Sequence, residues 1–245
     1  RRRRRRGRGR GGGRHTSTSS SAVLERLHRH LTSSQPSSTS TFSTCYPFTA
    51  PLKNAMCRSL EFKRALRLFV QREVCPALGV SRVAYQRKPT FRVHLAGGAA
   101  QGAPHADGLQ PYNHQPGEVN VWVPLTAVFG SNSLVCESAP GAGDFHSLEA
   151  EPGQFVSFYG NRCWHFTVAN DTDVTRVSFD LRVIPFELFD ATHCGSGRLK
   201  WALARGTVGK EPPGVGTEGY LPPLNLGEYY VDSEDHADDD GAWMR

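Results

Sequence analysis

Apolar residues recur at helical spacing in the stretch from residue 60 to residue 78. They are Leu60, Phe62, Ala65, Leu66, Phe69, Val70, Val74 and Leu78. Ser59 can cap the start of a helix here, and Gly79 can end it, while Pro76 kinks or stops the helix shortly before that glycine. The pattern predicts one amphipathic helix over 60–78. The residues expected on its solvent face are Lys63, Arg64, Arg67 and Arg72.

After Gly79 the apolar positions alternate instead, with turn-forming glycine, proline, asparagine and aspartate between the segments. Strands are expected at 82–86, 90–95, 118–123, 133–136, 154–159, 162–169 and 175–184. In the third of these, the valines face one way, and Glu118, Asn120 and Trp122 face the other. Short strands at this spacing indicate a mainly β sandwich or barrel, with the preceding helix covering an outer face.

The basic character of the chain is confined to its start. Residues 1–14 hold nine arginines, so a net charge of +6 for the whole chain leaves 6 − 9 = −3 for residues 15–245. The composition predicts a disordered leader over 1–53, a folded domain over 54–231 and an acidic disordered tail over 232–245. Within the domain, 190–218 reads as a long loop and 220–231 as a segment that returns as a strand.

The leader permits several interpretations. An Arg-rich, Ser-rich segment poor in acids is typical of an organellar transit peptide, of an Arg/Gly tail that binds RNA, or of a solvated extension. The six cysteines include no CxxC pair, which favours reduced thiols in an intracellular protein, cytoplasmic or organellar. No apolar run approaches the length of a membrane span, so we expect a soluble protein without a membrane partner. Nucleic acid is not an expected ligand of the folded domain.

Candidate chemistry begins at Pro104-His105-Ala106-Asp107-Gly108. Side chains two apart on an extended segment point the same way, so His105 and Asp107 can reach one metal ion. The spacing alone is weak, since His236-Ala237-Asp238 repeats it in the acidic tail, where solvated side chains are the better interpretation.

A third metal ligand has three candidates. His146 is expected in a loop, and His193 lies beyond the last core strand, whereas His165 lies within a predicted strand. Cys163 and Thr167 share its face. Two histidines and a carboxylate form the facial triad that holds non-haem Fe(II) and leaves positions open for a co-substrate and O2. A satisfied core histidine is the alternative interpretation of His165.

The strand after His165 has one apolar face and one polar face. The polar face consists of Arg176, Ser178, Asp180 and Arg182. Arg176 follows His165 by eleven residues, one hairpin later, and its guanidinium can bind a carboxylate with two parallel hydrogen bonds. Ser178 can share that carboxylate. We therefore expect the polar faces to line the interior of a barrel that carries metal and co-substrate.

With these residues in view, the sequence resembles the Fe(II)/2-oxoglutarate-dependent dioxygenases of the double-stranded β-helix, or jelly-roll, fold, and most of all their phytanoyl-CoA-dioxygenase-like branch. The resemblance covers roughly residues 82–185. It rests on His105-Ala106-Asp107, residues 120–125 (Asn-Val-Trp-Val-Pro-Leu), residues 152–158, His165, Asn170-Asp171 and Arg176-Val177-Ser178.

The resemblance implies a role for each of these side chains. His105, Asp107 and His165 would bind iron. Arg176 would bind the distal carboxylate of 2-oxoglutarate with help from Ser178, with Arg182 as the alternative arginine, and Asn120 or Tyr112 would touch the other end of the co-substrate. The activity implied is hydroxylation of a small polar metabolite by O2, with release of succinate and CO2. The family's pro-gly-ser-his segment is replaced by residues 137–141 (Glu-Ser-Ala-Pro-Gly), which leaves the substrate class open.

Three other functions compete with this one. A cupin-like jelly roll could bind a metal or small ligand without catalysis, but it has no need of Arg176 and Ser178 on the inner face. A Cys163/His165 nucleophilic enzyme would place nucleophile and base as neighbours on one strand face, without an acidic residue to orient the base. An RNA-binding protein driven by the Arg/Gly tail would bind through salt-sensitive, nonspecific contacts.

Overall fold

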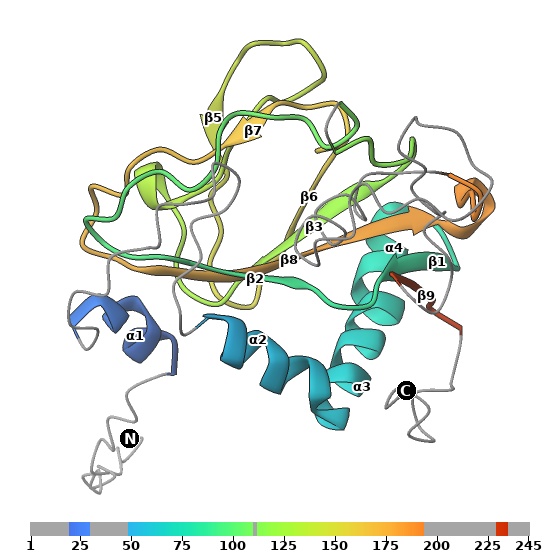
Figure 1. Cartoon of the computed structure of the whole chain (residues 1–245), viewed down its shortest axis with the longest axis horizontal. Coiled ribbons are helices and arrows are strands. Elements are labelled where there is room, and N and C mark those ends of the chain that lie inside the picture. The colour runs from blue at the N-terminus through green and yellow to red at the C-terminus, as the bar shows by residue number, and fades with distance from the viewer. Residues whose placement is uncertain (1–19, 30–48, 110–111, 194–228, 235–245) are drawn as a thin grey trace, which may run out of the picture.

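The computed structural model describes residues 20–29, 49–109, 112–193 and 229–234. Within them the chain is mainly antiparallel β-sheet, with a group of helices on one side (Figure 1). The helical elements are α1 (Ser20–Glu25), η1 (Leu27–Arg29), α2 (Thr49–Arg58), α3 (Leu60–Phe69), η2 (Val70–Val74), α4 (Cys75–Leu78), η3 (Gly130–Asn132) and η4 (Phe186–Leu188). The strands are β1 (Val83–Gln86), β2 (Thr90–His94), β3 (Val119–Pro124), β4 (Val135–Cys136), β5 (His146–Ser147), β6 (Val156–Phe158), β7 (His165–Phe166), β8 (Arg176–Pro185) and β9 (Tyr230–Asp232).

Strand β8 is the centre of the larger sheet. It pairs with β3 along one edge and with β2 and β1 in succession along the other. The order across this sheet is β6-β3-β8-β1-β9, with β2 also on β8. A smaller sheet has the order β5-β4-β7, and an antiparallel bridge between His105 and His165 adds the segment before β3 to its β7 edge. The two sheets are thus built from interleaved parts of the sequence.

Successive residues of β8 separate the hydrophobic core from the polar interior. Phe179, Leu181 and Val183 lie on one face, in a cluster that includes Leu66 of α3 and Val70 of η2. The alternate residues, from Arg176 to Arg182, lie on the other face, between the sheets. The predicted division of this strand into an apolar and a polar face is confirmed, and it follows from the period of two along a strand.

The predicted helix over 60–78 is present but contains one π-helical turn. The Ser59 side chain accepts a hydrogen bond from the Phe62 N–H, and Gly79 ends the helix in the left-handed conformation (φ 69°). Between them, the N–H of Cys75 bonds to the carbonyl of Val70, five residues back. Pro76 follows at once, and because its ring has no N–H and clashes with the ordinary helical carbonyl, a wider turn at this place fits the proline.

One helical residue expected in solvent is instead buried. The sequence pattern places Arg67 on the wet face, yet the structure leaves it 7% exposed. Arg67 follows Leu66 directly, and both belong to the buried side of α3. The prediction for Arg67 is therefore wrong, because the helix is covered over a wider arc than its apolar residues indicate.

The leader predicted to lack structure includes a short folded segment. Leu24 and Leu27 pack against Val93 and Val177 of the larger sheet. The backbone N–H of Thr175 donates to the carbonyl of Glu25. The prediction of disorder over 1–53 is wrong for 20–29 and for the start of α2, because a few leucines docking on an existing sheet need no core of their own. Residues 1–19 and 30–48 lie outside the described residues.

The C-terminal boundary also differs by a few residues. Asp232, predicted to begin a disordered tail, is the last residue of β9 and forms an ion pair with Arg82. Ser233 is buried, and its hydroxyl accepts a hydrogen bond from the Val83 N–H. The returning strand expected within 220–231 is found at β9. The predicted loop over 194–218 and the tail beyond residue 234 lie outside the described residues.

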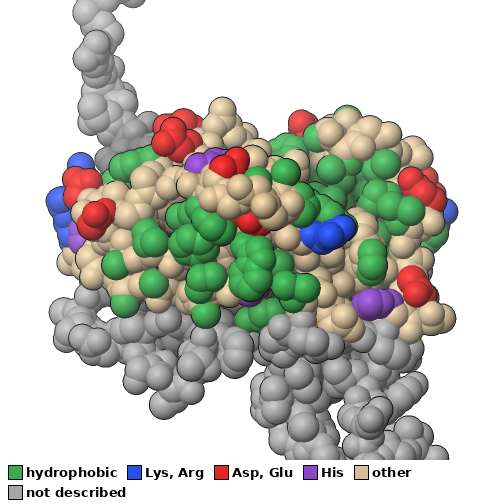
Figure 2. All heavy atoms as spheres, turned by 90° about the horizontal axis from the view of Figure 1, so that it is seen from above, with side chains coloured by type: hydrophobic (Ala, Val, Ile, Leu, Met, Phe, Trp, Pro, Cys, Tyr) green, Lys and Arg blue, Asp and Glu red, His purple; other side chains and the backbone are tan. Residues whose placement is uncertain are grey.

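The outer face of the smaller sheet exposes apolar side chains (Figure 2). Phe145, Trp164 and Val168 are each more than a third exposed. Phe145 makes an edge-to-face contact with Phe166. None of the helices in the described ranges is long and apolar enough to cross a bilayer.

Candidate metal centre

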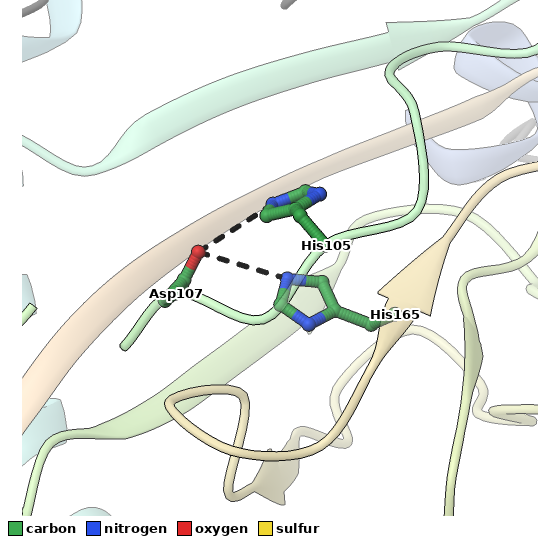
Figure 3. Close-up of side chains that lie close together, drawn as sticks. All are labelled: His105, Asp107 and His165. Atoms are coloured by element: carbon green, nitrogen blue, oxygen red, sulfur yellow. Dashed lines mark ion pairs between the residues drawn. The ribbon is translucent and has the colours of Figure 1, made fainter. Parts of the chain in front are cut away.

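His105, Asp107 and His165 converge between the two sheets (Figure 3). Each offers one ligand atom, and the three atoms lie within 4.8 Å of one another. The Oδ1 atom of Asp107 is 3.5 Å from Nε2 of His105 and 3.8 Å from Nε2 of His165. Backbone hydrogen bonds in both directions between His105 and His165 hold the two segments together. The three ligands predicted from sequence therefore form one site.

Both imidazoles are oriented by backbone carbonyls. Nδ1 of His105 lies 2.8 Å from the carbonyl oxygen of Ala103, and Nδ1 of His165 lies 3.0 Å from that of Cys163. A carbonyl can only accept, so each Nδ1 carries a proton, and in the neutral form of each ring Nε2 presents a lone pair. These Nε2 atoms are the ones that face Asp107. This is the arrangement by which outer partners orient metal-binding histidines.

The two oxygens of Asp107 have different surroundings. Oδ2 accepts hydrogen bonds from Nδ2 of Asn120 at 2.8 Å and from Nη2 of Arg182 at 3.1 Å. Oδ1 faces the two histidines. The carboxylate is 1% exposed, so this orientation is fixed by protein groups rather than by water. The result is a carboxylate that offers a single oxygen to an ion.

A tight turn after β6 clamps the ligand segment. The N–H groups of Asp107 and Gly108 donate to the carbonyls of Gly160 and Asn161. A Cβ atom on Gly160 would lie 2.8 Å from the Asn120 amide, and one on Gly108 would lie 2.5 Å from Oδ1 of Asn161. Neither glycine has positive φ, so the requirement at both positions is close approach. The turn thus packs directly against the residues that hold Asp107.

The electrostatics suit cation binding. Burial lowers the pKa of His165 to about 4, which keeps its imidazole neutral and able to donate a lone pair at neutral pH. Burial raises the pKa of Asp107, but Arg182 and the nearby histidines lower it more, so the pKa lies well below its ordinary value. Two imidazoles and one carboxylate are a donor set that fits a divalent transition metal.

A pocket that opens to solvent adjoins His105 and His165. Arg176 and Trp122 line it together with His105 and His165. Arg176 is 1% exposed, and one of its nitrogens, Nη1, donates to the Asn132 carbonyl at 3.0 Å. No carboxylate among the described residues forms an ion pair with it, and burial lowers its pKa to about 9. A buried guanidinium without an anionic partner at a cavity wall is suited to an anionic ligand.

Two further polar atoms near Arg176 lack a partner. Its own Nε and the hydroxyl of Ser178 are buried without a hydrogen bond to any described residue. Buried polar groups are nearly always satisfied in native proteins, so such orphans mark a place for a bound molecule or water. Both atoms belong to the polar face of β8. They fit the carboxylate-binding role that the sequence pattern predicts for Arg176 and Ser178.

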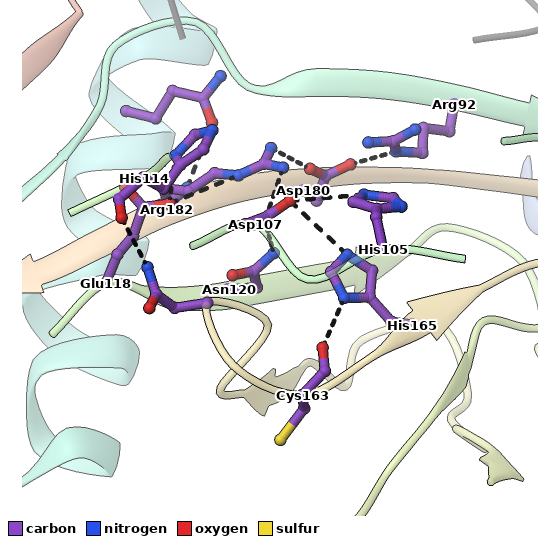
Figure 4. A network of polar contacts seen from close by, with 12 residues as sticks. Arg92, His105, Asp107, His114, Glu118, Asn120, Cys163, His165, Asp180 and Arg182 are labelled. Carbon is purple, nitrogen blue, oxygen red and sulfur yellow. Dashed lines mark hydrogen bonds and ion pairs between the residues drawn. The ribbon is translucent and has the colours of Figure 1, made fainter. Parts of the chain in front are cut away.

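Arg182, the alternative arginine, is already engaged. Its Nη1 lies 2.6 Å from Asp180, and its Nη2 lies 3.1 Å from Asp107 (Figure 4). Burial lowers its pKa, but these carboxylates raise it well above the ordinary value. A guanidinium shared between buried carboxylates has little capacity for another. Arg176 is thus the better placed of the two arginines for a ligand.

Several site residues were not predicted from sequence. Gly160 and Asn161 were predicted only as part of a turn, and Glu118 only as a residue on the face opposite the valines of its strand. Asn120, predicted to touch the co-substrate, instead donates to Asp107, while its Oδ1 is buried without a hydrogen-bond partner in the described part of the chain. The period of two in β3 does place Glu118, Asn120 and Trp122 together. Only the three-dimensional structure shows which of them reaches Asp107.

The other histidine and cysteine candidates lie apart from the metal-binding set. His146 is in β5 rather than in a loop, and it is exposed. Nε2 of His193 lies 2.8 Å from the carbonyl oxygen of Asn113. Burial raises the pKa of the Cys163 thiol, which disfavours the thiolate that a nucleophile needs. The Tyr112 ring lies 4.8 Å from the His105 ring, tilted by 37°.

Comparison with known proteins identifies one curated relative and several remote structural neighbours. No family model matches the chain. The streptomycin biosynthesis protein StrG of Streptomyces griseus is 43% identical over 106 residues, which cover 43% of this chain and 49% of StrG. The match thus spans about half the length of that relative.

The structural neighbours are non-haem enzymes. The α-ketoglutarate-dependent epimerase SnoN from nogalamycin biosynthesis aligns over 67% of this chain and 70% of its own, with 19% identity and a TM-score of 0.44. The non-haem monooxygenase ThoJ, as its nickel complex, aligns over 42% of this chain and 45% of its own, with 22% identity and a TM-score of 0.34. Both TM-scores lie below 0.5.

Proposed function

We propose that the protein is an Fe(II)- and 2-oxoglutarate-dependent oxygenase that hydroxylates a small polar metabolite and releases succinate and CO2. The observation that carries the proposal is the combination of two oriented Nε2 atoms and one carboxylate oxygen beside a cavity that holds an unpaired arginine. A site that bound only a cation would need the three donor atoms but not the arginine. Arg176 and Ser178 supply what a dicarboxylate co-substrate needs in addition.

We infer further that the fold is a double-stranded β-helix. The larger sheet contains the order β2-β8-β3-β6, and the smaller one contains the His105 segment followed by β7-β4-β5. Two four-stranded layers in which strands alternate between sheets along the chain are the arrangement of a jelly roll. This strand order supports the inference, and β1 and β9 extend the larger sheet beyond it.

Each residue of the site has a task in this reaction. Nε2 of His105, Oδ1 of Asp107 and Nε2 of His165 would hold the iron. Arg176 would bind the distal carboxylate of 2-oxoglutarate, with the Ser178 hydroxyl as a second donor. Bound iron and 2-oxoglutarate would supply the oxidative chemistry with O2.

The cavity walls shape and partly shield the reaction space. Trp122 is buried, and Phe158 packs edge to face on His165 at 5.3 Å, so apolar rings exclude water from one side of the ligands. Arg92 and Gln101 also line the cavity, and the Arg92 side chain is 34% exposed. These polar groups would contact the hydroxyl or other polar groups of the substrate. The name of the StrG relative supports a role in the biosynthesis of a small molecule.

Asp107→Ala tests the metal centre. Purified protein, handled without oxygen, should bind one Fe(II) and convert 2-oxoglutarate to succinate slowly even without substrate. The variant should lose iron binding and turnover, because the only anionic ligand is gone. Iron content and succinate are measured together. Iron binding and turnover that survive the substitution would contradict the proposal.

Arg176→Gln tests the co-substrate site. The apparent affinity for 2-oxoglutarate should fall at least 10-fold, in line with the roughly 1.5–3 kcal/mol of a charge-assisted hydrogen bond, while the metal affinity stays the same. Arg92→Gln is the matched control, since it removes a cavity arginine that is not assigned to the co-substrate. A non-catalytic cupin-like binder, the alternative function, would bind metal but show no 2-oxoglutarate-dependent succinate in wild-type protein.

A further inference from the structure

A line of buried polar groups connects the C-terminal strand to the metal centre. Tyr230 in β9 donates its hydroxyl hydrogen bond to Oε2 of Glu118. Oε1 of Glu118 lies 3.8 Å from Nε of Arg182, whose Nη2 lies 3.1 Å from Oδ2 of Asp107. Tyr230 and Glu118 are each 0% exposed. Tyr230, Glu118 and Arg182 are not members of the donor set, and the sequence pattern did not indicate these contacts.

Arg182 is the shared member of this line. It faces Asp107, Asp180 and Glu118, so a shift of its guanidinium toward one carboxylate withdraws it from another (Figure 4). Asp180 is also bound by Arg92. The position of Arg182 therefore depends on how firmly Glu118 is held, because buried charges without water respond mainly to one another.

Glu118 is held from two directions. Tyr230 bonds to its Oε2, and Nδ1 of His114 lies 2.7 Å from its Oε1. Tyr230 reaches this place only because β9 pairs with β1, and β1 pairs with β8, the strand that carries Arg182. The pairing of β9 with β1 thus determines whether the Tyr230 hydroxyl lies beside Glu118.

We propose that Glu118 and Tyr230 are positioning residues of the metal centre: they fix the Arg182 guanidinium, which holds Oδ2 of Asp107 and leaves Oδ1 turned toward the ion. The inference rests on the proposed function only in that Asp107 binds a metal. If Tyr230 has this role, full metal affinity requires strand β9, although no residue of β9 contacts the three proposed metal ligands.

Tyr230→Phe tests the inference with the full chain. The substitution keeps the ring and removes the hydroxyl, so the Kd for Co(II), measured by visible absorption, should rise about 10-fold, the lower end of what loss of an outer partner costs. Saturating metal should restore the affinity for 2-oxoglutarate to the wild-type value. Tyr85→Phe is the matched control, because Tyr85 lies in the strand beside β9 but packs in the helix-covered core on the opposite face.

Glu118→Gln provides a second, independent variant. The amide keeps the size of the side chain and removes its charge, so the Co(II) Kd should rise more than in Tyr230→Phe, by about 10–100-fold. The double variant should bind no more weakly than Glu118→Gln alone, because both changes act through Arg182. Unchanged Co(II) affinity in Tyr230→Phe, or equal losses in Tyr230→Phe and Tyr85→Phe, would overturn the inference.

The failure of this inference and that of the proposed function give different results. Wild-type protein that binds Co(II) but never consumes 2-oxoglutarate would refute the oxygenase function, and the comparison of metal affinities would still decide the role of Tyr230. Wild-type protein that binds no divalent metal would refute both.

Discussion

At the scale of single residues, the proposed metal site depends on the two carboxylate oxygens of Asp107, which have different partners. Asn120 and Arg182 take one carboxylate oxygen, and the other is left to face the histidines. Gly160 makes this possible by giving the Asn120 amide room. The geometry of a metal ligand is therefore controlled by a residue that offers no donor atom of its own.

Gly160→Ala is expected to weaken metal binding about 10-fold or more, as loss of an outer partner does. The added methyl would lie 2.8 Å from the Asn120 amide and push it away from Asp107. The measurement is Co(II) affinity by titration, beside a check of folding by circular dichroism.

A double-variant cycle identifies the cause. In an Asn120→Ala background the amide is absent, so adding Gly160→Ala should cost little more than Asn120→Ala alone. If the losses of Co(II) affinity in the two single variants simply added in the double variant, the methyl group would act on a residue other than Asn120.

At the scale of elements, the N-terminal segment formed by α1 and η1 packs against the main sheet. Leu24 and Leu27 are half-buried against Val93 and Val177, and Nδ1 of His28 lies 2.9 Å from the Thr175 hydroxyl oxygen. Thr175 directly precedes Arg176. The segment therefore covers the start of β8, where the proposed co-substrate arginine lies.

Replacing both Leu24 and Leu27 by alanine should lower the free energy of unfolding by about 1–3 kcal/mol, less than two fully buried leucines would cost, because each is only half-buried. Urea unfolding measures the change. Val23→Ala is the control, since Val23 is 52% exposed on the same helix. Equal, negligible effects in both proteins would show that the α1–η1 segment does not dock in solution.

At the scale of the whole molecule, buried histidines make the metal-free protein sensitive to acid. Burial lowers the pKa of both His94 and His165 from 6.5 to about 4. Between these values the unfolded chain binds protons that the folded chain does not, so stability falls as pH falls from 6.5 toward 4. Each histidine contributes a loss of about 3 kcal/mol at the lower end.

His114 acts in the opposite direction. Burial lowers its pKa, but Glu118 raises it further, so the net shift is upward. Its contribution to stability is fully present below 6.5 and is lost as pH rises through the raised pKa. Two histidines with a lowered pKa outweigh one histidine with a raised pKa, so stability is still expected to fall in acid.

Urea unfolding of metal-free protein between pH 7 and pH 4.5 measures this slope. His94→Gln should flatten it, because the glutamine amide can donate to the Ala99 carbonyl as Nε2 does but does not titrate. His146→Gln at an exposed position is the control for the substitution itself. A slope that His94→Gln leaves unchanged would contradict the assignment.

The sequence by itself determined the parts of the protein that follow from periodicity. The alternation in β8 predicted that Arg176, Ser178, Asp180 and Arg182 share one face, and the helical spacing predicted a helix from residue 60 to Gly79. His105 and Asp107 were predicted to point the same way. These expectations hold because a strand or a helix sets side-chain directions locally, whatever the rest of the chain does.

Only the tertiary structure decided which groups meet across strands that are distant in sequence. It placed the Arg182 guanidinium beside Asp107, while Arg176 forms no ion pair with a carboxylate in the described part of the chain. The sequence could not choose between these two arginines, because both lie on the same strand face. It also brought Tyr230 to Glu118, a contact between residues that are 112 positions apart. Register and packing between sheets settle such contacts, and no local pattern encodes them.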